Sequence, residues 1–337
     1  MNNLHFIENE IRPEELVGEL KKLCAQDRAL LMRHKEKFVA VTCPACDSND
    51  RIHAFNKLDM NFDQCLNCET IYASPRPTFA ILQEHYTNSE SYRFWAEHIF
   101  AASEPVRREK IFKKRVDMVL NYCHEYGVDN EVILEVGSGF GTFCEELKSR
   151  NFFKRIIGVE PTPHLAQRCR DKHIEVIEDF IENVYLNDLH VNVVVSFETI
   201  EHLFSPCNFL RTCNKTLSGK GLLFITCPNM HGFDTSLLKA KSKSVSFEHL
   251  NLFNPKSISM LLERAGFKIL SLETPGVLDA ELVRKSILAG EYDISGQPFL
   301  KRILIDQWEI LGIPFQNFLS ENKLSSHMFV VSRKCII

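Results

Sequence analysis

A glycine-rich segment constrains the fold of this 337-residue chain more than any other feature. The segment LEVGSGFG, residues 134–141, follows a short apolar run and precedes a helical pattern. Its glycines stand at every second position, so the backbone there must turn tightly or approach a ligand closely. A phosphate, a dinucleotide and a sulfonium cofactor all use glycine-rich turns between a strand and a helix. The segment therefore predicts an α/β fold with a ligand site after this strand.

Short apolar runs alternate with helical patterns through the middle of the chain. The runs cover 131–137, 155–161, 173–179, 191–198, 221–228 and 267–273, and a last strand is expected at 327–334. Two of the intervening helices have start and stop signals, which are Ser205-Pro206 with Gly219 and Asn254-Pro255 with Gly266. Nearly continuous apolar strands alternating with helices indicate a largely parallel, doubly wound sheet.

Four of the twelve cysteines have the spacing of a metal site. Cys43, Cys46, Cys65 and Cys68 form the pattern C-x2-C-x18-C-x2-C, in which two tight turns complete a tetrahedral zinc shell. The segment between the pairs is expected to be a β-hairpin, and His53 within it could replace one cysteine as a ligand. A closed shell of four ligands leaves no position for water, so the zinc would be structural.

These signals divide the chain into six segments. They are an N-terminal helical segment (1–40), a zinc-ribbon module (41–76), aromatic-rich helices on the substrate side (77–130), the ligand-binding core (131–274), a helical insertion (275–325) and the last core strand (326–337). The insertion is interpreted either as a cap over the active site or as an element of a homodimer.

The composition is that of a globular protein without a strong charge bias. It is 45% hydrophobic and 25% charged, with a formal net charge of −4. A nucleic-acid partner is not expected, because such partners select a basic face. We find no secretory signal and no stretch long enough to span a membrane. A cytoplasmic location is expected, where most cysteines are free thiols or metal ligands.

The residues around the glycines narrow the type of ligand. A phosphate-binding loop needs Lys-Ser or Lys-Thr after its last glycine, and Thr142-Phe143 stand there instead. A dinucleotide fingerprint needs a glycine at position 142. The observed Glu-x-Gly-x-Gly-x-Gly pattern, with Glu160 after the second strand, resembles class I S-adenosylmethionine-dependent methyltransferases over residues 131–274. The resemblance implies a Rossmann-like core and S-adenosylmethionine as cofactor.

The resemblance also implies roles for individual residues. The backbone of the glycine segment would lie alongside the methionine part of the cofactor. Glu135 would orient the amino end of the cofactor, and Glu160 would hold both ribose hydroxyls. Glu178 or Asp179 would flank the adenine, and Phe197-Glu198 would line the sulfonium side. The implied cofactor-binding residues are Glu135, Gly137, Ser138, Gly139, Gly141, Glu160, Glu178, Asp179, Phe197 and Glu198.

Two histidines are candidates for chemistry on the acceptor. His249 is the first candidate for a general base, because neighbouring Glu248 could orient or charge its imidazole. His202, which follows Glu201, is the second candidate. Alignment of the acceptor with the methyl group would supply much of the remaining rate enhancement.

The combination of a four-cysteine module, this core and a Glu-His segment is similar to sugar methyltransferases of bacterial polysaccharide and deoxysugar biosynthesis. Ser246 stands where the ketosugar C-methyltransferases commonly have Tyr. The resemblance implies O- or C-methylation of a nucleotide- or carrier-linked sugar. Methylation of ribosomal or transfer RNA, and non-catalytic cofactor binding, are the alternatives.

Overall fold

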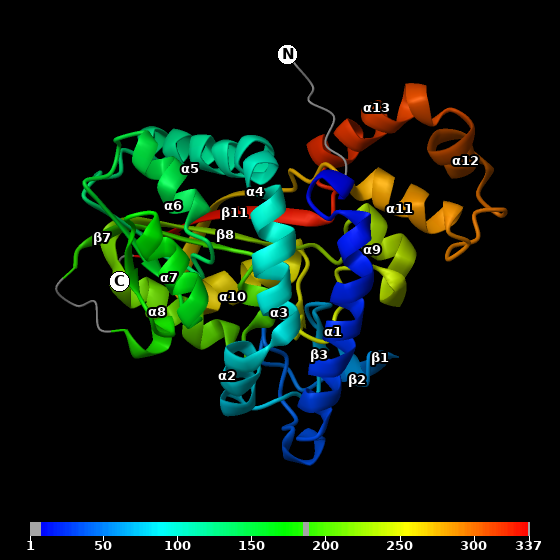
Figure 1. The fold of residues 1–337 in the computed structure, drawn as a ribbon, viewed down its shortest axis with the longest axis horizontal. Helices are drawn as coiled ribbons and strands as arrows, with labels where there is room; N and C mark the ends of the chain where they lie inside the picture. Colours follow the sequence, from blue (N-terminus) through cyan, green and yellow to red (C-terminus); the bar gives the residue numbers. More distant parts are fainter. Residues whose placement is uncertain (1–7, 185–188, 336–337) are drawn as a thin grey trace.

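A seven-stranded mixed sheet forms the centre of the computed structural model, which describes residues 8–184 and 189–335 (Figure 1). The strand order is β10-β11-β8-β7-β4-β5-β6, and only β11 runs antiparallel to its neighbours. The strands are β4 (Val132–Val136), β5 (Arg155–Val159), β6 (Glu175–Ile177), β7 (Val191–Phe197), β8 (Leu217–Pro228), β10 (Phe267–Glu273) and β11 (His327–Lys334). The expected doubly wound α/β fold is confirmed. The ends of the predicted segments 1–40 and 326–337 lie outside the described residues.

The order of the strands indicates where a ligand would bind. β5 and β6 extend the sheet to one side of β4, whereas β7 and β8 extend it to the other. Open α/β sheets bind ligands beyond the carboxyl ends of their strands at such a switch point. The glycine segment follows β4 and the Glu198–His202 segment follows β7, so the two meet at this edge.

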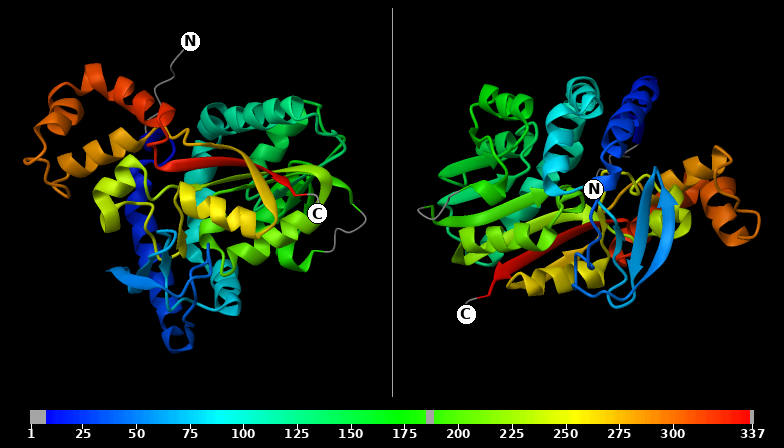
Figure 2. Two further views of the ribbon diagram at one scale, coloured as in Figure 1. Left: turned by 180° about the vertical axis from the view of Figure 1, so that it is seen from behind. Right: turned by 90° about the horizontal axis from the view of Figure 1, so that it is seen from below.

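Helices cover both faces of the sheet (Figure 2). Apolar side chains of α5 (Lys113–Glu125) and α6 (Thr142–Ser149) pack against one face, and those of α8 (Pro206–Thr216) and α10 (Pro255–Arg264) against the other. All five residues of β4 and all seven of β7 are buried. Burial on both faces explains why these strands are almost continuously apolar.

The predicted ends of α8 and α10 can be compared with the observed ones, and only those of α10 both agree. α10 begins with a capping box between Asn254 and Ser257 and is followed by Gly266 at φ +85°, as predicted. α8 ends at Thr216, so the prediction that Gly219 marks its end is wrong. The buried Leu217 already has extended backbone and begins β8, which contains Gly219.

A second, four-stranded antiparallel sheet lies next to the cysteine pairs in the chain, and Cys65 ends one of its strands. Its strands are β1 (Arg51–Lys57), β2 (Met60–Cys65), β3 (Ile71–Ala73) and β9 (Asn251–Leu252). β1 and β2 form the predicted hairpin. Its two-residue turn, Leu58-Asp59, has positive φ at both positions, as a tight hairpin turn requires. β9 comes from the core, so the two sheets are joined by a strand pairing.

Further helices flank the two sheets. α1 (Glu14–Met32) packs on α3 (Glu90–Phe94), and α2 (Phe79–Asn88) comes directly before α3 in the chain. Two π-helical turns, Trp95–Phe100 and Arg108–Phe112, link α3 through α4 (Ala101–Arg107) to α5. Between β10 and β11, α11 (Asp279–Leu288), α12 (Pro298–Lys301) and α13 (Trp308–Glu321) form an apolar cluster with α9 (Phe233–Leu238) that projects from the body (Figure 1). No described helix is both long and apolar enough to cross a bilayer.

Candidate functional site

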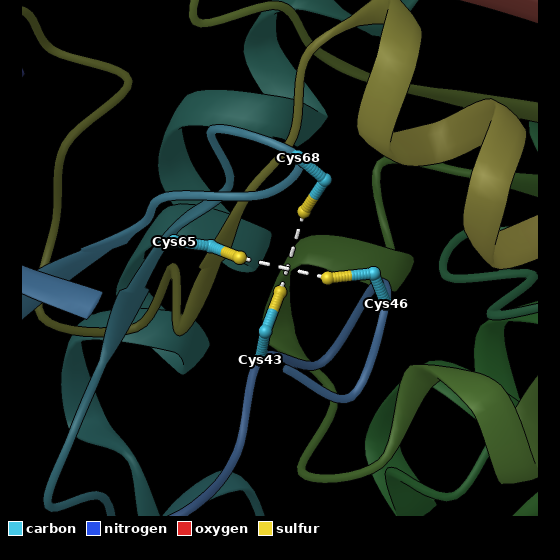
Figure 3. Close-up of side chains that lie close together, drawn as sticks. All are labelled: Cys43, Cys46, Cys65 and Cys68. Atoms are coloured by element: carbon cyan, nitrogen blue, oxygen red, sulfur yellow. Dashed lines mark hydrogen bonds between the residues drawn. The ribbon is translucent and has the colours of Figure 1, made fainter. Parts of the chain in front are cut away.

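The four cysteines converge on one point (Figure 3). The sulfur atoms of Cys43 and Cys68 lie 3.4 Å apart, and those of Cys46 and Cys65 lie 3.5 Å apart. All four sulfurs lie within 4.8 Å of one another. A tetrahedral shell with Zn–S bonds of about 2.3 Å has sulfur–sulfur edges of about 3.8 Å. The donor set therefore fits a zinc ion. His53 has a half-exposed side chain and lies 3.9 Å from Asp63, outside this group.

Helix α10 holds this cysteine centre against the core. The Asn254 side chain donates to the carbonyl oxygen of Cys68 at 3.0 Å. Arg264, at the other end of the helix, donates to the carbonyl oxygen of Ala45 at 2.6 Å. Each turn of the cysteine centre is thus bound by the same helix, which also packs on the central sheet.

The glycine segment adopts a conformation that suits glycine. Gly137, Gly139 and Gly141 have φ of +76°, +53° and +65°, a region that other residues rarely enter. Glu160 organises the segment, because its carboxylate accepts from the backbone N–H of Gly139 at 2.8 Å and of Thr162 at 3.0 Å. Each oxygen of that carboxylate keeps a further lone pair, so Glu160 fits a second role as acceptor for ribose hydroxyls.

Two other predicted cofactor residues belong to the same segment. Glu135 is 4% exposed and accepts from the thiol of Cys144 at 3.0 Å. Burial raises the pKa of Glu135 to about 8. Ser138 is buried, and its hydroxyl lies 3.5 Å from the sulfur of Cys169. A buried carboxyl of this kind fits a cationic ligand group. An ammonium ion beside it would supply a positive charge and so favour the ionised carboxylate.

The predicted adenine-side residues follow β6. Glu178 forms an ion pair with Arg170 at 2.7 Å. Asp179 accepts from the side chain of Asn183 at 2.8 Å and from the backbone N–H of Phe180. Both carboxylates therefore have partners within the protein.

The predicted sulfonium-side residues follow β7. The ring of Phe197 contacts the Phe143 ring edge-on, and the Arg115 guanidinium lies 4.9 Å from its centroid. Glu198 pairs with Arg115 at 3.1 Å and with His327 at 3.4 Å. Neither Arg115 nor His327 was predicted to belong to the site, because each comes from a segment with no recognisable motif.

The candidate catalytic histidines lie together. The rings of His202 and His249 have centroids 4.6 Å apart and are nearly perpendicular. Burial lowers the pKa of both imidazoles, so both are neutral at pH 7. His249 Nδ1 lies 2.7 Å from the carbonyl oxygen of Ser244. Because a carbonyl can only accept, Nδ1 carries the proton and Nε2 has a free lone pair.

The expected pairing of Glu248 with His249 is not observed. Glu248 instead bonds to Nε2 of His85 at 3.1 Å, in α2. The hydroxyl of Tyr86, the next residue, lies 3.1 Å from His202 Nδ1. Neither α2 residue could be predicted from the sequence, since they lie 163 and 116 positions from their partners and belong to no motif.

A run of aromatic side chains connects the histidines with the glycine segment. Successive ring centroids from His202 through Tyr86, Tyr92 and Trp95 to Phe140 lie 6.0 to 6.4 Å apart. Phe140 belongs to the glycine segment itself. These contacts of the α2–α3 region thus connect the candidate histidines with the glycine segment.

The comparisons with known proteins concern the central part of the chain. Residues 107–272 match the model of a family described as a methyltransferase domain. A Mycobacterium tuberculosis protein named "Probable S-adenosylmethionine-dependent methyltransferase" is 30% identical over 137 residues, which are 40% of this chain and 48% of that protein. A "Bifunctional glycosyltransferase/methyltransferase" of Fusobacterium nucleatum is 25% identical over 29% of this chain and 18% of its own length.

One solved structure aligns with most of this chain. The plantazolicin methyltransferase BpumL, in complex with S-adenosylhomocysteine, covers 76% of this chain and 94% of its own at 14% identity and a TM-score of 0.49. The chain spans about half the length of the mycobacterial relatives that it matches. The matched segment contains the glycine segment, Glu160 and both candidate histidines. Residues 107–272 thus match a methyltransferase domain, and the chain is similar over 137 residues to proteins named as S-adenosylmethionine-dependent methyltransferases.

Proposed function

We propose that the whole chain transfers a methyl group from S-adenosylmethionine to an oxygen or carbon atom of a small sugar linked to a nucleotide or carrier. The observation that carries methyl transfer is the placement of the glycine segment and two neutral imidazoles at one edge of the sheet. The first would hold the cofactor, and the second would face the acceptor. Their connection through α2 and α3 supports a shared active site.

The cofactor's contacts follow from the residues at the switch point. Glu160 would accept from the ribose hydroxyls, Glu135 would face the amino group, and Glu178 or Asp179 would flank the adenine. When bound, S-adenosylmethionine supplies an electrophilic methyl group. His249 would act on the acceptor, with His202 beside it, while Glu248 would keep its bond to His85 and hold the α2 side of the site.

A sugar acceptor is supported by the four-cysteine module combined with a Glu-His segment before α10. The formal charge of −4 favours a small molecule over RNA. We also propose that the cysteine centre holds a structural zinc ion, since its sulfurs form a closed shell bound to α10. A reducing cytoplasm, in which the twelve cysteines would not form disulfides, is proposed as the location.

Two measurements test this function. Calorimetry should detect S-adenosylmethionine binding, and Glu160→Ala should weaken it by about one to two orders of magnitude, because charged hydrogen bonds contribute about 1.5–3 kcal/mol. Transfer of labelled methyl groups should then be measured with a panel of sugar nucleotides and with ribosomal and transfer RNA. Transfer to RNA alone would overturn the sugar acceptor. NAD binding without S-adenosylmethionine binding would overturn the cofactor.

A further inference from the structure

Three side chains on the acceptor side form a second cluster of metal-binding groups. Glu201, His202 and His249 each offer one ligand atom, and these atoms lie within 4.8 Å of one another. The first two follow β7, whereas the third lies just before β9. The cysteine centre is a separate group of ligands, so the two clusters can be tested independently.

The hydrogen bonds of the two imidazoles leave one nitrogen free on each. His249 donates from Nδ1 to the carbonyl of Ser244, and His202 bonds through Nδ1 to the hydroxyl of Tyr86. Within the described residues, neither Nε2 atom has a hydrogen-bond partner. Metal-binding histidines commonly fix one ring nitrogen on an oxygen atom and present the other to the ion.

The carboxylate of Glu201 gives an independent indication of a ligand. Its residue is 1% exposed, and among the described residues its buried Oε2 has no hydrogen-bond partner. A buried polar oxygen without a partner costs about 1–3 kcal/mol. The amide of Asn251 binds the backbone carbonyl of Glu201, and this bond fixes the position of the residue without satisfying its side chain.

We infer that Glu201, His202 and His249 bind a divalent first-row transition-metal ion. Two imidazoles and one carboxylate suit manganese, iron, cobalt or zinc better than magnesium or calcium, which prefer oxygen ligands alone. Three protein ligands leave coordination positions open. This inference rests on the proposed function in one respect: the ion would bind an oxygen of the acceptor, so that His249 acts on the acceptor through the metal.

A manganese titration tests the site without measuring activity. Mn²⁺ prefers oxygen and nitrogen ligands, so it should leave the zinc at the cysteine centre in place. The full-length protein is titrated with Mn²⁺, and the free ion is followed by electron paramagnetic resonance. We expect one equivalent to bind. Glu201→Gln and His249→Gln should each weaken binding by about tenfold or more, because each removes a direct ligand.

The controls separate ligand loss from unfolding. His231→Gln changes a half-exposed histidine outside the cluster and should bind Mn²⁺ as the unaltered protein does. Circular dichroism and calorimetry with S-adenosylmethionine report whether each variant folds. The two substitutions lie on different segments, so a folding failure of one leaves the other as a test.

The outcomes are distinct. No stoichiometric Mn²⁺ or Co²⁺ binding beyond the cysteine centre would overturn the inference, as would unaltered affinity in both ligand variants. In that case the imidazoles contact the acceptor directly. Metal binding without S-adenosylmethionine binding would instead overturn the proposed function and leave the metal site standing.

Discussion

We predict that cofactor binding releases a proton from the buried carboxyl of Glu135. Its pKa is raised from 4.5 to about 8 by burial, so at pH 7 about nine-tenths of the molecules carry a proton there. The ammonium group of S-adenosylmethionine, placed against Glu135 as proposed, would favour the ionised form. Binding at pH 7 should therefore release about 0.9 proton from this residue.

Calorimetry in two buffers of different ionisation enthalpy measures the number of protons released. Glu135→Gln should lose this release, and the difference between the two proteins excludes protons that the cofactor itself exchanges. The release should approach zero at pH 9.5, where the unbound carboxyl is already ionised. Glu145→Gln, a change on α6, is the matched control. Burial raises the pKa of Glu145, but the Arg108 guanidinium beside it outweighs this effect and holds the pKa below its usual value. Equal proton release by the unaltered and Glu135→Gln proteins at pH 7 would refute the reasoning.

The same pKa predicts the pH dependence of stability. The folded pKa of Glu135 lies above the unfolded value, so its contribution is fully present below about pH 4.5 and is lost as pH rises towards 8. A difference between 4.5 and about 8 corresponds to about 5 kcal/mol. In the absence of cofactor, Glu135→Gln should therefore gain stability relative to the unaltered protein between pH 5 and pH 8. Urea unfolding at both pH values measures this gain, and a constant difference would contradict it.

The remaining predictions concern the glycine segment, the cysteine centre and the acceptor side. Gly137→Ala should weaken S-adenosylmethionine binding more than Gly139→Ala. Both positions have positive φ, but only at position 137 would the new Cβ lie 2.6 Å from a threonine hydroxyl. Equal dissociation constants for the two variants would argue against this. Cys65→Ser should lower the zinc content from one equivalent and unfold the hairpin, which metal analysis and circular dichroism can detect; full zinc retention would exclude the four-thiolate shell. His249→Ala should lower turnover by about 10²-fold or more with cofactor affinity nearly unchanged, since it lies on the acceptor side; an unaltered rate would transfer the role to His202.

Local signals in the sequence were sufficient for the central sheet. Strand β7 is buried on both faces, so its apolar run is visible without knowledge of its neighbours. Positive φ at Gly137, Gly139 and Gly141 explains why these positions are glycine. The paired cysteines converge because each pair occupies one tight turn. Each of these features depends on residues close together in the chain.

Contacts between distant segments could not be predicted in the same way. The bond of Glu248 to His85 replaces the expected pairing with His249, because α2 packs over this region and brings a nearer partner. The pairing of β9 with β3 joins residues 251–252 to residues 71–72. No periodicity or motif in either segment indicates its partner, since β9 is only two residues long.

The buried pair Asn251 and Arg76 explains why the cysteine module and the acceptor side form one unit. The side-chain amide of Asn251 donates to three carbonyl oxygens in the segment that carries Glu201 and His202, the shortest of these bonds being 2.7 Å to Leu203. The oxygen of the same amide accepts from Arg76 at 2.9 Å. Arg76 is fully buried at the exit of the cysteine module, where its other donors also reach backbone carbonyls. The module therefore supports the backbone that carries Glu201 and His202, which gives the cysteine centre a direct physical connection to the candidate catalytic residues.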